Sequence, residues 1–151
     1  MKSHKGWYCL IYPEKFIKQL DEHMQSSKIT KDGIFIEYKS SLELKFIKYC
    51  EMNSNISRYS LEPFAIQYIK PTDGKFHRYY IDFFVEFKNG AKFLVEIKPY
   101  SQTKKPVLRK NPAKYKDELI TYYINQAKWS AAKDFAEKRN MKFIVLTERE
   151  L

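Results

Sequence analysis

Residues 80–98 form two runs of alternating apolar and polar side chains, joined by an Asn-Gly pair. Alternation with a period of two is typical of β-strands, and Asn-Gly between two such runs is a strong hairpin signal. The segment therefore predicts a hairpin with strands over about 76–87 and 92–98. One acid lies in each strand, Asp82 in the first and Glu96 in the second.

The length of the turn decides whether the two acids share a face of the hairpin. A two-residue turn over 89–90 would set Asp82 opposite Ile97, so the acids would lie on opposite faces. A three-residue loop over 88–90, with its glycine in the left-handed conformation, sets Asp82 opposite Glu96. We favour the three-residue loop because it also pairs apolar residues, Phe83 with Val95 and Ile81 with Ile97. The apolar face of the first strand is then made by Tyr79, Ile81, Phe83, Val85 and Phe87.

Two carboxylates in otherwise apolar strands are costly to bury unless they pair with bases or bind a cation. Facing side chains have β-carbons about 4.5–5.5 Å apart, which is close enough for Asp82 and Glu96 to hold one hard cation such as magnesium. Such a cation polarises a scissile phosphate and lowers the pKa of an attacking water. Lys98 shares the face of Glu96 and fits a role in orienting or deprotonating that water, or in stabilising charge on phosphorus. The pattern predicts a metal-dependent phosphodiesterase site; the alternative is a solvent-facing acid pair that is salt-bridged to Lys98.

The remaining elements follow from apolar spacing, turn residues and prolines. Helices are expected over residues 13–24, 41–52 and 116–139, and extended segments over 34–38, 64–69, 76–87, 92–98 and 141–146. Residues 26–33 are expected to form a loop. The three middle strands form an antiparallel meander, and the last helix carries the chain across to the final strand. We therefore expect a compact mixed α/β fold with a small sheet flanked by helices.

The composition favours one folded domain with a polyanionic partner. The 151 residues suit a single domain over 1–151, and Lys and Arg outnumber Asp and Glu by 28 to 18, a net charge of +10. A balance that basic favours nucleic acid; the alternative is a merely soluble basic surface. The two cysteines, Cys9 and Cys50, lack zinc-site spacing and suit a reducing compartment. No membrane span and no signal peptide are expected.

A basic segment directly follows the predicted site. Residues 104–116 contain six basic residues and no acid, which favours contact with a phosphate backbone over a solvated loop. His77 and Arg78 are expected to add to this DNA-binding surface. The basic residues of the segment are Lys104, Lys105, Arg109, Lys110, Lys114 and Lys116. Nothing in the chain predicts sequence-specific reading of bases.

Two further polar residues have both a functional and a structural interpretation. Glu43 lies three residues after Ser40, the spacing of a capping box, in which the glutamate bonds the first amides of its own helix. The residue pattern alone favours this cap. Gln126, on the expected inner face of the last helix, is a catalytic candidate that can bond a metal-bound water or a phosphate. Its structural alternative is to satisfy a partly buried backbone group.

Glu43, Asp82 and the run Glu96-Ile97-Lys98, in a helix–strand–strand order, resemble the PD-(D/E)XK nuclease superfamily, with Ile81 in place of its proline. A closer resemblance, to the head completion nucleases of T-even-type tailed phages, covers most of the chain. It rests on eight stretches, at residues 5–7, 12–15, 38–46, 73–79, 95–99, 102–106, 123–129 and 146–148. The chain is also similar to the amino-terminal nuclease domain of the Tn7-type transposition endonuclease. Residues 16–36 depart from the family pattern, with a longer insert.

The resemblance implies a restriction-endonuclease-like core and a DNA endonuclease that depends on magnesium, with manganese as an alternative. By family position, Asp82 and Glu96 are metal ligands and Lys98 is the catalytic lysine. Glu43 is the remote helical acid, which contacts the metal directly or through water. The resemblance therefore reverses the preference for a purely capping role of Glu43.

The resemblance also implies a place and partners for the activity. The catalytic core is expected over residues 40–151, after an amino-terminal extension over 1–38. The enzyme is expected to act in phage head completion after DNA packaging, in the bacterial host cytoplasm or, as an alternative, in the virion. Its expected partners are DNA and head, portal or neck proteins. One alternative is a non-catalytic head completion protein that binds DNA ends or the portal. A weaker one is the nuclease subunit of a transposition complex, which would need a second domain.

Overall fold

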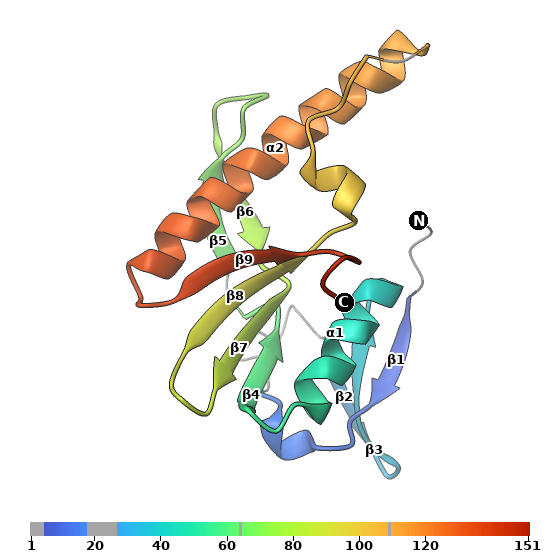
Figure 1. Ribbon diagram of the computed structural model, residues 1–151, viewed down its shortest axis with the longest axis vertical. Coiled ribbons are helices and arrows are strands. Elements are labelled where there is room, and N and C mark those ends of the chain that lie inside the picture. The colour runs from blue at the N-terminus through green and yellow to red at the C-terminus, as the bar shows by residue number, and fades with distance from the viewer. Residues whose placement is uncertain (1–4, 18–26, 64, 109) are drawn as a thin grey trace.

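The computed structural model describes residues 5–17, 27–63, 65–108 and 110–151. Its helices are α1 (Ser41–Met52) and α2 (Pro112–Glu137), with short 3-10 helices η1 (Pro13–Lys15) and η2 (Tyr100–Thr103). Its strands are β1 (Gly6–Cys9), β2 (Ser27–Thr30), β3 (Gly33–Tyr38), β4 (Ile56–Leu61), β5 (Ala65–Ile69), β6 (Phe76–Tyr80), β7 (Phe83–Phe87), β8 (Lys92–Ile97) and β9 (Lys142–Leu146). In this part of the chain they form three sheets, with strand orders β1-β3-β2, β4-β7-β8-β9 and β5-β6 (Figure 1).

The β7–β8 hairpin has the register that the three-residue turn predicts. Phe83 pairs with Val95, and the Phe87 N–H donates to the Ala91 carbonyl at 2.8 Å. Gly90 has a φ of +90°, a conformation that favours glycine. By this register Asp82, just before β7, lies level with Glu96, so the turn sets the two acids opposite each other.

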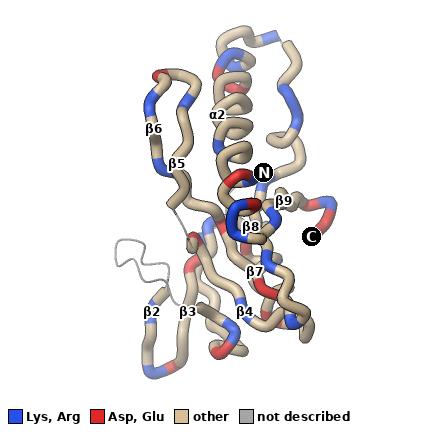
Figure 2. Tube along the Cα trace, turned by 90° about the vertical axis from the view of Figure 1, so that its left-hand side faces the viewer, with Lys and Arg blue, Asp and Glu red and all other residues tan. Residues whose placement is uncertain are grey.

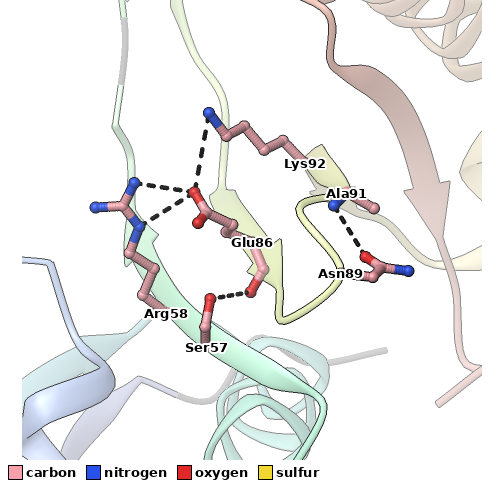
Figure 3. Close-up of polar contacts among 6 residues, drawn as sticks. All are labelled: Ser57, Arg58, Glu86, Asn89, Ala91 and Lys92. Carbon is pink, nitrogen blue, oxygen red and sulfur yellow. Dashed lines mark hydrogen bonds and ion pairs between the residues drawn. The ribbon is translucent and has the colours of Figure 1, made fainter.

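Polar contacts fix this register near the turn (Figure 3). The Glu86 carboxylate of β7 accepts from Arg58 Nη2 of β4 at 2.9 Å and lies 4.0 Å from Lys92 Nζ of β8. The Asn89 side chain accepts from the Ala91 N–H at 2.9 Å, which shapes the turn itself. A one-residue slip would break these contacts as well as the apolar pairing.

Replacing Gly90 by Ala should destabilise the protein by about 1–2 kcal/mol, because an L side chain is strained at this φ although the space around it is open. Urea denaturation measures the change, with Lys88→Ala in the same exposed turn as the matched control. Equal midpoints for the two variants would contradict the strained-turn interpretation.

The strand predicted over 76–87 is broken in the structure. Ile81 and Asp82 separate β6, which pairs with β5, from β7, which lies in the central sheet. The prediction that the apolar residues of 76–87 share one face is therefore wrong, because the face changes at this break. Tyr79 packs in the core cluster on the α2 side, whereas Phe83 packs in the cluster on the α1 side. The break lets β5 and β6 leave the central sheet and extend beside α2 (Figure 1).

The two helices cover opposite faces of the central sheet. Val95 of β8 packs in a cluster with Phe46 of α1, and its neighbour Leu94 packs in a cluster with Ala132 of α2. Glu96 has the same strand parity as Leu94, so it points to the α2 side. The acid of β8 is thus placed under the long helix.

Several predicted elements are confirmed, with small changes at their ends. The helix over 41–52 has the predicted bounds, and β9 runs parallel to β8 after the α2 crossover, as expected. The last helix begins earlier, at Pro112, because Asn111 caps it by accepting from the Lys114 N–H at 3.2 Å. A Pro at the first helical position needs no hydrogen bond there, so the helix extends back to it.

Other predictions are wrong or lie outside the described residues. The sequence pattern missed β4, and residues 27–30 form β2 instead of a loop because they pair with β3. The helix expected over 13–24 is a 3-10 turn over Pro13–Lys15, followed by an extended Phe16. The rest of that expectation, from residue 18, lies outside the described residues. Within the described residues no helix has the length and hydropathy to cross a membrane.

The amino-terminal sheet is held to α1 by a buried carboxylate. Glu51, which is 1% exposed, accepts from the N–H groups of Ile11 and Tyr12, each at 2.7 Å. Leu10 and Ile36 of this region lie in the same apolar cluster as α1. The segment before α1 therefore packs against the core that carries the predicted site.

Candidate active site

Asp82 lies at the break between β6 and β7, directly beside the end of β8. Its Oδ2 accepts from the Ile97 N–H at 2.8 Å. The chain leaves β6 at this point, so Asp82 projects from a bend instead of from a continuous strand. A side chain held by a backbone N–H of the facing strand has little freedom, which suits a residue that must keep a fixed position.

Glu96 is 4% exposed and is held by two side chains from different elements. Its Oε2 accepts from the Tyr79 hydroxyl of β6 at 2.7 Å and from Trp129 Nε1 of α2 at 3.1 Å. Sequence reasoning missed both partners, and it placed Tyr79 on the opposite face. The only signal for them was their position within stretches that resemble the family.

The two facing acids, Asp82 and Glu96, are close together and poorly solvated, so their negative charges repel each other. Burial, then the charge and hydrogen bonding of Glu96, then the charge of Glu43, raise the pKa of Asp82 well above its usual range. Like charges that are close and poorly solvated favour a shared proton. A cation placed between them would relieve the same repulsion.

Glu43 performs part of the predicted cap and also lies near the acids. The Glu43 N–H donates to Ser40 Oγ at 3.1 Å, and its carboxylate lies 3.5 Å from that hydroxyl. Burial, opposed by Lys39 and reinforced by Glu62, raises the pKa of Glu43. Within the described residues, no three His, Cys, Asp or Glu side chains are grouped to hold a metal together. The structure therefore does not assemble Glu43 with the other two acids as a direct ligand set, because its carboxylate turns back toward its own helix end.

An ion pair between Lys39 and Glu62, which the sequence did not predict, borders the acids. Lys39 bonds the Glu62 carboxylate, and the Glu62 N–H donates to the Asp82 carbonyl at 2.8 Å. Burial alone would lower the pKa of Lys39, but Glu62, with Glu43 and Asp82, raises it overall. Glu62 has a φ of 43°, unusual for a residue other than glycine. The backbone hydrogen bond between Glu62 and Asp82 places the Lys39–Glu62 pair next to the acids. An unusual φ such as that of Glu62 is common near functional sites.

Two lysines, Lys98 and Lys128, are candidates for the surroundings of Glu96. Lys98 follows β8, and its N–H donates to the Leu146 carbonyl of β9 at 3.0 Å, so the strand geometry continues to it. Lys128 of α2 has its Nζ 5.6 Å from the ring centroid of Tyr79, whose hydroxyl bonds Glu96. Burial, and then the charge of Lys98, lower the pKa of Lys128, whereas the charges of Glu96 and Asp82 raise it. Lys128 is therefore a further candidate residue that sequence reasoning missed.

The inner face of α2 differs from the prediction by one position. Gln126 is exposed, whereas Asn125 is 5% exposed. A helical residue turns by about 100° from its neighbour, so a one-residue error in phase moves a side chain off the face. The predicted inward position of Gln126 is wrong, and Asn125 is the polar residue that α2 buries there.

The predicted basic residues lie on two segments that flank α2 and on the first turns of α2 itself. Figure 2 shows Lys and Arg along the β5–β6 hairpin on one side of α2 and along the segment that precedes α2 on the other. On the hairpin, Arg78 is exposed and His77 pairs with Asp73 at 2.7 Å. Lys104, Lys105 and Lys110 are exposed on the segment before α2, and Lys114 and Lys116 are exposed at the start of α2. Arg109 lies outside the described residues. These side chains form two arms rather than one patch.

Comparisons with known proteins identify the family of this chain. Residues 53–148 match the family model described as TnsA-like endonuclease N terminal. The chain is also 35% identical over 130 residues to the head completion nuclease of Enterobacteria phage T4, covering 81% of this chain and 85% of the relative. The family model includes Asp82, Glu96 and Lys98, whereas Glu43 precedes the matched range.

Proposed function

The chain belongs to the TnsA-like endonuclease N-terminal family, and from this premise we propose that it is a metal-dependent DNA endonuclease that hydrolyses phosphodiester bonds. The observation that supports the proposal is the meeting of Asp82 and Glu96 at the end of β8, one residue before Lys98 in the chain. The predicted resemblance to phage head completion nucleases and to TnsA-like nucleases is confirmed by the two matches. The metal, the DNA contacts and the biological role below are proposals.

Asp82 and Glu96 fit a hard divalent cation, magnesium or manganese. Oδ2 of Asp82 and Oε2 of Glu96 accept from donors of the protein, and the two carboxyl groups also hydrogen-bond each other. A cation would take the place of the proton in that contact. Magnesium commonly uses one or two protein carboxylates and several waters. Two acids therefore suffice, and Glu43 would act through one of those waters. When bound, the cation would polarise the phosphate and lower the pKa of a water.

The protein's own side chains would do the rest of the work. The fixed Asp82 and Glu96 would hold the cation and orient the attacking water by accepting from it, because both acids are held by hydrogen bonds and have little freedom. Lys98, at the end of β8, would orient that water or stabilise charge as phosphorus becomes five-coordinate. Lys128 adds a second ammonium beside Lys98. Its lowered pKa still leaves it able to bond a phosphate oxygen.

The two basic arms would hold the DNA on either side of the site. Lysines of the segment before α2, and Arg78 of the β5–β6 hairpin, are exposed and lie on opposite sides of α2. Contacts of this kind position the backbone and carry no base information. We therefore propose DNA binding that is sensitive to salt and independent of sequence.

The proposed role is completion of the phage head after DNA packaging, with head, portal or neck proteins as partners. The support is the similarity to the head completion nuclease of phage T4, since the alignment covers 85% of the length of that relative. The amino-terminal extension would then be the region available for such partners, whereas the nuclease core would contact DNA.

The proposed function predicts that the purified protein nicks or cuts supercoiled plasmid in magnesium or manganese and does nothing in excess EDTA. Gel electrophoresis of timed samples measures the effect, with calcium as a control cation that often supports binding without cleavage. Salt-sensitive DNA binding with no cleavage in any of these metals would contradict the enzyme and leave the DNA-binding alternative.

A further inference from the structure

A polar cavity of about 660 Å³ lies between α2 and the segment that precedes it. Figure 1 shows this segment running alongside the amino-terminal half of α2. The volume is within the range of roughly 300–1,000 Å³ that is usual for small-molecule sites. None of the roles proposed so far uses this cavity.

One residue of the cavity wall, Asn125, is both polar and largely buried. Asn125 is 5% exposed and lines the cavity. Among the described residues, the buried side-chain atoms that lack a hydrogen-bond partner belong to Glu51 and Tyr59 and not to Asn125. Asn125 matters here because it borders a cavity that a ligand can enter. An amide offers both donor and acceptor, the pair that reads the edge of a nucleobase.

The other walls suit a base rather than a bare phosphate. Tyr122 lines the cavity and supplies an aromatic surface for stacking. Asp117 and Glu118 also line it, and carboxylates accept from the amino groups of bases but repel phosphate. Lys104 of the preceding segment and Lys114 of α2 also line the cavity and can bond the phosphates that flank a base.

The cavity is linked to the proposed cleavage site along the chain. Asn125 lies four residues, about one helical turn, before Trp129, which bonds Glu96. Ser101, which also lines the cavity, follows three residues after Lys98. These two links are the reason for assigning the cavity to the same DNA substrate as the acids.

We propose that this cavity binds one unpaired nucleotide of the DNA substrate, stacked on Tyr122 and bonded by Asn125. The proposal rests on the proposed function and deepens it, because it names the substrate class: DNA with an unpaired or extruded base near the cut. Taking a base out of a duplex has a free-energy cost, which is lowest where the base is already unpaired. Fully paired duplex is then the poorer substrate.

The test uses full-length protein with Asp82→Asn, so that DNA is bound without being cut. Fluorescence anisotropy compares a duplex that has one unpaired nucleotide with the fully paired duplex. We expect at least about tenfold tighter binding of the former, and loss of most of that preference in Tyr122→Ala. Tyr122→Phe should keep the preference, because stacking needs the ring and not the hydroxyl. Ile120→Ala, an exposed α2 residue that does not line the cavity, is the matched control and should behave as the parent.

The following outcomes separate this proposal from others. Equal affinity for both duplexes, or the same loss in Ile120→Ala as in Tyr122→Ala, would overturn the cavity's role. Tight binding of free dAMP, dCMP, dGMP or dTMP by calorimetry, without a preference for unpaired DNA, would identify a free-nucleotide site instead and also overturn it. Wild-type protein that cuts both duplexes at one rate would refute the cavity proposal and leave the nuclease intact. A preference for unpaired DNA in a wild-type protein that does not cut DNA would support the cavity proposal and refute the nuclease.

Discussion

Asp82→Asn is expected to slow DNA cleavage by about 10³-fold or more and, at the same time, to stabilise the metal-free protein by about 1 kcal/mol. Cleavage falls because the amide is a poor ligand for a divalent cation. Stability rises because burial and the neighbouring acids raise the pKa of Asp82, which marks an unfavourable site for a charge. The amide oxygen of Asn can still accept from the Ile97 N–H, so the backbone contact is kept.

Thermal denaturation in EDTA, and cleavage in magnesium, measure the two effects on one preparation. Asp73→Asn is the matched control, since Asp73 is exposed in the turn between β5 and β6 and lies outside the acid pair. A destabilised Asp82→Asn protein would show that Asp82 is a structural residue. Cleavage at the wild-type rate would show that it is not a ligand.

Glu51→Ala is expected to destabilise the protein by about 3 kcal/mol or more. The buried Glu51 carboxylate accepts from the Ile11 and Tyr12 N–H groups, and hydrogen bonds to a charged group contribute about 1.5–3 kcal/mol each. Alanine would leave both donors without their acceptor and open a cavity at the end of α1. The loss should separate the amino-terminal sheet from α1 before the central sheet unfolds.

Chemical denaturation gives the total loss, and hydrogen exchange of residues 6–12 shows where it occurs. Glu14→Ala, an exposed acid in the neighbouring 3-10 turn, should change stability by less than about 0.5 kcal/mol. If Glu51→Ala unfolds no more easily than Glu14→Ala, the buried carboxylate does not hold the two parts together.

The hairpin register could be derived from the sequence because it depends on local rules. Strand parity, one glycine and the pairing of apolar residues leave a single register that satisfies all three. The helix over Ser41–Met52 could likewise be predicted from the sequence, since a serine cap and an apolar stripe define it. These features need no knowledge of distant parts of the chain.

The break at Asp82 could not be derived in the same way. Residues 76–87 continue to alternate, and only the pairing of β6 with β5 and of β7 with β4 ends one strand and starts another. The partners of Glu96 depend on that break, because it turns Tyr79 toward the acid. The phase of α2 also depends on packing, so sequence reasoning chose Gln126 where the fold buries Asn125.

The family resemblance added what local rules could not. It linked Glu43 on α1 to two acids on the hairpin, although the structure leaves Glu43 partly committed to the Ser40 cap. It did not identify the Lys39–Glu62 pair or Lys128, whose proximity to the acids comes from tertiary packing. These residues are the first to test once the main site is established.

The central claim is that the acid pair and Lys98 form one centre that cleaves DNA. The most direct measurement is the single-turnover rate of plasmid nicking in magnesium by wild type and by Lys98→Ala, with DNA affinity measured on the same samples. We predict a rate about 10²–10⁴-fold lower for Lys98→Ala with nearly unchanged affinity, because the lysine acts on the reacting atoms. Equal nicking rates for the two proteins would contradict the account.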